Sequence, residues 1–269
     1  MSLEAILMKA KKSFIIASIP FTFLTASHYA VADRNQKVTN NYRVDAEHMS
    51  IFSDIPNFAS ASFTVNESSG NYTIDGSMRG LHFSYHSRLN IHVEGNKVNG
   101  RYMPSHYELN YTDNTLLSST GTKTTIIDFD YDLNRATSYS YNIDDGQRTE
   151  LYDTRQNGVS IDDNVKDMIS AIMDLRYSDL NSSRQIRTII SGRVKNYNAR
   201  FRGNETVNIH GADMECAKYS IQIEAGVLDS NRYNFIFWIG RGNARTPLKI
   251  NIRPGNDSLM AWHTGTIRE

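Results

Sequence analysis

Apolar and polar residues alternate along most of this chain, and the pattern changes its period once. Strict alternation is typical of β-strands that pack one face and expose the other. Between Ser160 and Leu180, however, apolar residues recur every three or four positions, which predicts an amphipathic helix at about 162–177. Its apolar stripe consists of Val165, Met168, Ile169, Ile172 and Leu175. The pattern therefore predicts a mainly β protein with one helix.

Charged and polar residues suit both ends of this helix. Ser160 and Asp163 have the spacing of a capping box, with Asp in place of the usual Glu, so the helix is expected to begin near Ser160. Arg176 suits the negative C-terminal end. Because the rest of the chain offers only sheet to cover the stripe, we expect a strongly curved antiparallel sheet, a half-barrel or open barrel, with the helix across it or plugging its mouth.

The clearest strand is predicted at 81–93, where odd positions are mainly apolar and even positions polar. Turn residues recur every 8–12 residues or so, a spacing typical of meanders, sandwiches and barrels. No linker rich in Pro, Gly or Ser divides the chain, so a single domain is expected. Further strands are predicted at 40–47, 98–111, 123–133, 137–143, 186–202, 206–210, 215–226, 232–239, 246–252 and 258–264.

The first 32 residues have the pattern of a signal peptide. Three lysines precede the apolar run Phe14–Ala26, which is too short to span a bilayer, and Ala30-Val31-Ala32 supplies a cleavage site after Ala32. We expect residues 33–269 to form the exported domain. No later apolar run approaches the ~20 residues of a membrane-spanning helix. Either Met1 or Met8 could be the initiator.

Charge and cysteine content narrow the classes of function. The whole chain has 29 basic and 29 acidic residues, and the predicted signal removes three Lys and one Glu, leaving 26 and 28. This near-neutral balance gives no general attraction to nucleic acid. Cys216 is the only cysteine, which excludes an internal disulfide and a thiolate metal site; we expect a buried, inert thiol in a strand.

Histidines on the predicted strand 81–93 raise the possibility of a metal site. His82, His86 and His92 share a face, but an extended strand separates the first two by ~13 Å and the next two by ~20 Å. Ligands of one zinc must all lie ~2 Å from the metal. The spacing therefore favours surface histidines, and no metal or cofactor is expected.

Two charged runs can each be interpreted as a binding site or as a solvent-facing strand. Asp128–Asp132 resembles the start of a calcium loop, but the sixth and twelfth positions are Leu133 and Tyr139 instead of Gly and Glu, so a solvent-facing strand is favoured. The basic run 184–202 could bind an anionic headgroup or glycan if a bulge near 196–198 brought its cations together; a solvated sheet face is the favoured interpretation. The chain also lacks G-x-S-x-G, H-E-x-x-H, Ser-x-x-Lys and phosphate-loop motifs, so no catalytic residues are assigned.

Four segments, in order, carry a family resemblance. They are Arg101–Tyr107 (RYMPSHY), Ile127–Tyr131 (IDFDY), Asp167–Arg176 (DMISAIMDLR), and Phe237–Ile239 (FWI) followed by Pro247–Ile250 (PLKI). In these segments the chain resembles a widespread family of exported proteobacterial proteins catalogued as a domain of unknown function. The resemblance implies a strongly curved antiparallel sheet around the helix and a location in the periplasm or at the outer membrane. It brings no activity or catalytic residues.

The leading hypothesis is a non-enzymatic envelope protein whose sheet and helix enclose an apolar groove for a lipid or acyl ligand. Its lipid part rests on analogy with half-barrel lipoprotein carriers. The alternatives are an envelope assembly or structural factor that acts through protein contacts, and a hydrolase with a dispersed site. Candidate residues, for ligand binding or for holding the helix against the sheet, are Asp167, Ile172, Arg176 and Trp238.

Overall fold

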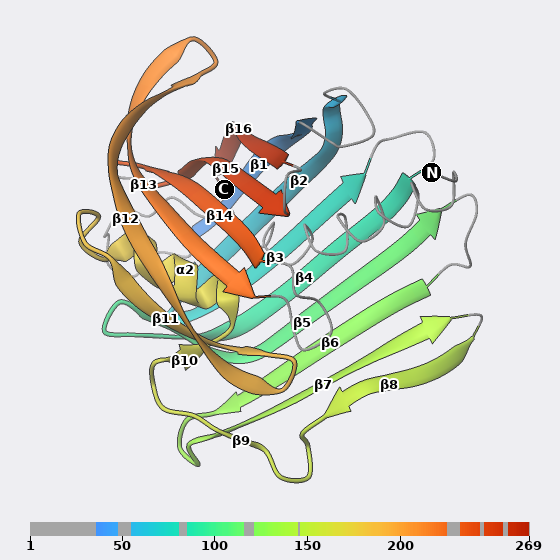
Figure 1. Ribbon diagram of the computed structural model, residues 1–269. Coiled ribbons are helices and arrows are strands. Elements are labelled where there is room, and N and C mark those ends of the chain that lie inside the picture. The colour runs from blue at the N-terminus through green and yellow to red at the C-terminus, as the bar shows by residue number, and fades with distance from the viewer. Residues whose placement is uncertain are drawn as a thin grey trace.

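The computed structural model describes residues 36–47, 55–80, 85–115, 121–144, 146–224, 232–242, 245–254 and 258–268. The predicted signal peptide and the first four residues of the predicted strand 81–93 lie outside these ranges. Within them the chain forms one sixteen-stranded sheet and one helix, α2 (Met168–Tyr177). The sheet curves around the helix and stays open (Figure 1). This confirms the predicted fold class.

The sheet consists of two meanders that meet in its middle. Its order is β10-β11-β12-β13-β14-β15-β16-β1-β2-β3-β4-β5-β6-β7-β8, with β9 paired to β7, and every pairing is antiparallel except β10 with β11. The first and last strands of the described chain therefore lie side by side, with Val38 opposite Arg268. The strands are β1 (Gln36–Glu47), β2 (Ile55–Ser68), β3 (Asn71–Gly80), β4 (Tyr85–Val98), β5 (Arg101–Thr115), β6 (Gly121–Asp130), β7 (Arg135–Asp144), β8 (Gln147–Asp153), β9 (Val159–Ser160), β10 (Val165–Lys166), β11 (Arg184–Ile190), β12 (Arg193–Ile209), β13 (Ala212–Glu224), β14 (Arg232–Gly240), β15 (Pro247–Pro254) and β16 (Ser258–Arg268).

Four hairpins turn on two residues with positive φ, the geometry that matches the twist of paired strands. They are Ser69-Gly70, Asn99-Gly100, Ser191-Gly192 and His210-Gly211. The Ser191-Gly192 turn falls inside the predicted strand 186–202, which was wrong: this segment is two strands, β11 and β12. Ile190 pairs directly with Arg193, so the turn shifts the alternation by one residue, a change too small for the apolar pattern to reveal.

The helix begins later than predicted. Its N-cap is Asp167, whose Oδ1 accepts the N–H groups of Ile169 (2.8 Å) and Ser170 (3.0 Å). Ser160 instead lies in β9, and Val165 in β10. The cause is local: Asp162 Oδ1 accepts the N–H of Asn164 (2.9 Å), which closes a turn and directs the chain into β10 before a helix can form.

The helix lies on the concave side of the sheet, and residues on several of its faces are buried. Besides the predicted apolar positions, Ser170, Ala171, Met173 and Arg176 are buried, and only Asp174 and Tyr177 are partly exposed. A helix covered on nearly all sides belongs to a core rather than to a surface. Aromatic and aliphatic side chains from β1 to β6 and from β11 to β15 complete this core.

A second, smaller apolar cluster lies elsewhere on the sheet. It contains Val207, Ile209, Cys216, Trp238 and Leu248. The pairing of β12 with β13 shifts register between Phe201 and Asn204, and this irregularity lets β12 contact β15, which is not its neighbour in the sheet. Cys216 is fully buried, as expected, and burial raises the pKa of its thiol to about 11.

Among the described residues, no helix combines the length and apolar character that crossing a membrane would require.

Candidate functional site

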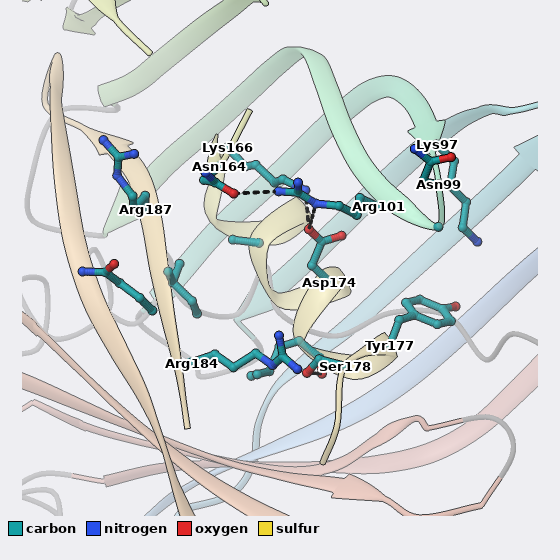
Figure 2. Close-up of a pocket in the computed structure, with 15 residues that line it drawn as sticks. Lys97, Asn99, Arg101, Asn164, Lys166, Asp174, Tyr177, Ser178, Arg184 and Arg187 are labelled. Carbon is teal, nitrogen blue, oxygen red and sulfur yellow. Dashed lines mark hydrogen bonds and ion pairs between the residues drawn. The ribbon is translucent and has the colours of Figure 1, made fainter. Parts of the chain in front are cut away.

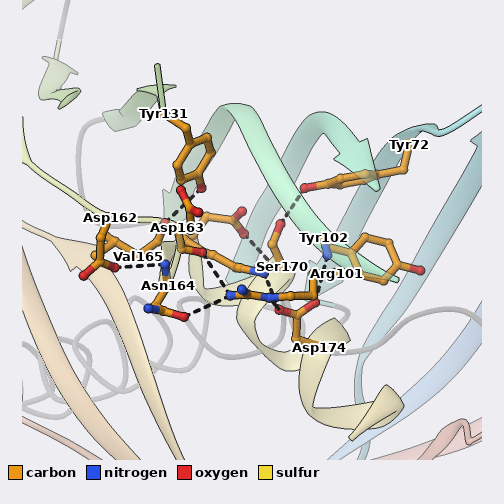
Figure 3. A network of polar contacts seen from close by, with 12 residues as sticks. Tyr72, Arg101, Tyr102, Tyr131, Asp162, Asp163, Asn164, Val165, Ser170 and Asp174 are labelled. Carbon is orange, nitrogen blue, oxygen red and sulfur yellow. Dashed lines mark hydrogen bonds and ion pairs between the residues drawn. The ribbon is translucent and has the colours of Figure 1, made fainter. Parts of the chain in front are cut away.

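A polar network anchors the start of the helix to the sheet (Figure 3). The hydroxyl groups of Tyr72 on β3 and Ser170 on α2 lie 2.9 Å apart, and both residues are buried. The Tyr131 hydroxyl donates to the carbonyl of Val165 (2.9 Å). Strand residues far away in sequence thus fix both the helix and the segment before it.

A second set of contacts surrounds Asp174, the partly exposed acid of the helix. Its carboxylate pairs with the buried ammonium of Lys166, and its Oδ1 accepts the backbone N–H of Tyr102 (2.8 Å). Burial lowers the pKa of Lys166, and the Asp174 charge opposes this shift. Arg101 donates to the carbonyl of Asp163 (3.0 Å) and to Asn164 Oδ1 (3.1 Å). These contacts tie the β4–β5 turn to the chain that leads into α2.

Beside this network lies a groove of about 680 Å³, which we call the basic groove (Figure 2). Most of its cations already have an acidic or carbonyl partner: Lys97 pairs with Glu67 (3.1 Å), Lys166 with Asp174 and Arg187 with Asp162. Such pairs leave little net positive charge for a ligand. The cations that line the groove are Lys97, Arg101, Lys166, Arg184 and Arg187.

The basic run 184–202 is divided between two surfaces. Arg184 and Arg187 line the basic groove, whereas Arg200 and Arg202 line a separate hollow that also includes Lys218. The pairing of β11 with β12 is regular, and the bulge falls between Phe201 and Asn204, not near 196–198. The pairing of β11 with β12 therefore contains no bulge that could bring the cations of the run onto one surface.

A third hollow, which we call the apolar pocket, lies where the sheet, the start of α2 and the β11–β12 turn meet. Its volume is about 110 Å³. Most of the wall is aliphatic or aromatic, and it comes from β5, β6, β8, α2 and the hairpin tip. The lining residues are Tyr107, Leu109, Tyr111, Lys123, Thr125, Ile127, Tyr152, Asp167, Met168, Ile189, Ile190 and Ser191.

One carboxyl group and one amine stand in this mainly apolar wall. Asp167 Oδ2 is buried and has no hydrogen-bond partner, and burial raises the pKa of its carboxyl. Burial lowers the pKa of Lys123. Sequence reasoning missed Lys123, although one signal was present: it occupies the same face of β6 as Thr125 and Ile127, where the alternation places inward-facing residues.

The four predicted site residues do not meet at one site. Asp167 caps the helix and lines the apolar pocket. Ile172 is 1% exposed in the main core, and Arg176 is fully buried near the other end of the helix. Trp238 lies in the second apolar cluster. Of these residues, only Asp167 lines one of the three hollows described above.

Of the histidines and aspartates considered for metal binding, His92 and Asp128 form hydrogen bonds with residues on neighbouring strands. His92 Nδ1 is 2.7 Å from Asp75 Oδ1, and His106 Nδ1 is 2.6 Å from Asp128 Oδ1. Over the described ranges, no group of three or more His, Cys, Asp or Glu residues could hold a metal ion. His82 lies outside those ranges. Asp130 ends β6, so the strand predicted at 123–133 is shorter than expected.

Asp167→Asn should change how stability depends on pH. In the folded protein burial raises the carboxyl pKa above its ordinary 3.8, so the folded state holds a proton that the unfolded chain releases. Stability therefore falls as pH rises above 3.8, by about 1.4 kcal/mol for each unit by which the pKa is raised. Asn keeps the capping oxygen and does not titrate.

The stability of Asp167→Asn relative to the parent should therefore increase from pH 4 to pH 8 in urea unfolding. Asp163→Asn, a change at an exposed acid in the same segment, is the matched control and should give a pH dependence parallel to the parent. Parallel curves for Asp167→Asn as well would contradict the raised pKa.

Comparisons with known proteins identify a similar fold and a family for this chain, but neither comes with a described activity. No curated protein matches the chain. A solved structure described as a beta-barrel-like protein of domain of unknown function DUF1849, from Brucella abortus, is similar in fold, with a TM-score of 0.50 and 8% identity over 89% of this chain and 100% of that one. The model of the family described as "Protein of unknown function (DUF3108)" matches residues 41–261. The chain belongs to this DUF3108 family.

Proposed function

We propose that this protein is a non-catalytic binding protein of the cell envelope that holds a lipid or acyl ligand in the apolar pocket. The observation that carries the proposal is the pocket itself, a concave and mainly apolar hollow on rigid strands with a small number of polar groups. Ligand sites in proteins have this composition. The signal-like sequence of residues 1–32 supports the envelope as the place of action.

The size of the pocket suits one end of a ligand. A volume of about 110 Å³ equals the share of about four water molecules in the liquid. An acyl ligand would place one end there and extend along the concave face. The Ser191-Gly192 turn borders the pocket, and its movement would be the simplest way to enlarge it.

The experiment is native mass spectrometry of the exported protein purified from its own periplasm, beside an extraction of bound lipid. We expect a defined adduct that releases a lipid or acyl compound. Ile190→Asp should weaken this binding about tenfold or more, because it places a carboxylate in the apolar wall. Leu133→Asp is the control, since Leu133 is 71% exposed in the β6–β7 turn and does not line the pocket.

A clean unliganded mass, with no uptake of added lipid, would overturn the proposal and favour the envelope-partner hypothesis, for which crosslinking in intact periplasm is the test. The free edge of β8 is a surface a partner strand could use, but it carries Arg148, Glu150 and Asp153, and charged edges oppose strand addition. Screening with ester, phosphate and glycoside substrates should give no turnover; turnover would favour the hydrolase hypothesis.

A further inference from the structure

Lys123 contributes a positive charge to the wall of the apolar pocket. It pairs in register with Tyr111 on β5 and with Asn142 on β7. Its side chain shares the inner face of β6 with Thr125 and Ile127, and all three line the pocket. A lysine in an apolar wall needs a physical explanation, because burying a cation without a partner is costly.

Other lysines in the hollows of this protein have carboxylate partners. Lys97 pairs with Glu67, Lys166 with Asp174, and Lys218 with Glu205. For Lys123, no side-chain hydrogen bond, ion pair or cation–π contact joins it to the described residues. Burial alone lowers the pKa of Lys123, which shows that its ammonium is partly removed from water.

The acidic residues described near this face form no ion pair with Lys123. Asp144 stands opposite Gly121 on the same side of the sheet and makes no ion pair with Lys123. Asp167 lies on the helix side of the pocket, and its Oδ1 accepts hydrogen bonds from the N–H groups of Ile169 and Ser170. A surface lysine that extended its ammonium into water would not be desolvated in this way.

We infer that Lys123 is the counter-charge for the anionic head group of the ligand, so that the pocket takes an amphiphile with an acyl chain and a carboxylate or phosphate head. This inference rests on the proposed function and names its ligand class. The acyl chain would lie along the inner face of β6 from Lys123 past Thr125 to Ile127, a span of about 13 Å. Asp167, at the helix end, would face the chain and not the head.

The arrangement also predicts the orientation of the ligand. Burial raises the pKa of the Asp167 carboxyl because an apolar surrounding disfavours its charge, and a second anion beside it would be repelled by the charged form. The cation on β6 and the acid on α2 therefore give the pocket two different ends. An anion at the Lys123 end and hydrocarbon at the Asp167 end satisfies both groups.

The test compares three probes of equal chain length, decanoate, decyl phosphate and decanol, by isothermal titration calorimetry below their aggregation concentrations. With the exported protein, at least one anionic probe should bind about ten- to a hundredfold more tightly than decanol. This ratio of affinities corresponds to the free energy of one hydrogen bond to a charged group. Lys123→Met should remove this preference, so that neither anionic probe binds more tightly than decanol. Lys195→Met, at an exposed lysine on β12, should keep the preference.

Each outcome separates the inference from the function on which it rests. Equal binding of all three probes, unchanged in Lys123→Met, would overturn the inference and keep the apolar pocket as a lipid site. Binding of none would overturn both. A preference for decanoate over decyl phosphate would identify a fatty acid, and the reverse a lipid phosphate. Lys123→Met removes an unpaired buried charge, so it should fold at least as well as the parent, which circular dichroism checks.

Discussion

Arg176→Ala should lower the free energy of unfolding by about 3–5 kcal/mol, the range for breaking a buried charged contact. Arg176 is fully buried, and its Nε donates to the carbonyl of Arg245 (2.7 Å). Arg245 Nη1 in turn donates to the carbonyls of Arg176 and Ser178, both at 2.8 Å. The two arginines thus join the end of α2 to the chain just before β15.

The alanine variant loses this connection, leaves the Arg245 carbonyl without its donor and opens a cavity at the end of the helix. Arg43→Ala is the control: its side chain is 48% exposed and pairs with Asp45 (3.2 Å), so the change should cost less than about 1 kcal/mol. Urea unfolding measures both. Equal costs for the two variants would show that Arg176 does not hold the helix in place.

Trp238→Ala should lower the free energy of unfolding by about 3–5 kcal/mol, as expected for an aromatic side chain removed from a core. Trp238 is 4% exposed and packs in the second apolar cluster with Val207, Ile209 and Leu248. The ammonium groups of Lys218 and Lys249 lie 5.0 and 4.7 Å from the centre of its ring. Both packing and cation–π contacts are lost together.

Because Trp238 does not line the apolar pocket, the folded fraction of Trp238→Ala should bind ligand as the parent does. Trp238→Phe keeps an aromatic ring and should recover most of the stability. Calorimetric unfolding and ligand titration below the melting temperature test the two statements. A loss of affinity without a loss of stability would instead place Trp238 at a binding surface.

The sequence predicted the strands well because alternation and turn residues are local signals. The pattern through Ile74 and Ile91 is strict, and both residues are buried on the inner face. The helix start was wrong because capping-box spacing indicated Ser160 and Asp163, whereas the first helical N–H groups bond to Asp167 and Asp162 closes a separate turn.

The apolar pocket could not be predicted, since it depends on contacts between distant parts of the chain. Tyr107, Met168 and Ile190 meet only after α2 packs against both β5 and β11. Lys123 begins the apolar face of β6, where a sequence pattern interprets lysine as the solvated end of a strand. Its desolvation becomes visible only when the hairpin tip is in place.

The pairing of β1 with β16 has a consequence for the order of events during folding. These neighbours come from opposite ends of the described chain, so β1 waits for nearly the whole polypeptide before one of its two edges is covered. Contacts between such distant residues form slowly because a long loop must close first. A chain delivered gradually from its N-terminus would complete the β1–β8 meander early and join it to the β11–β16 meander last. Until that moment one edge of β1 has no strand beside it. In a chain that stops before β16 this edge would stay uncovered.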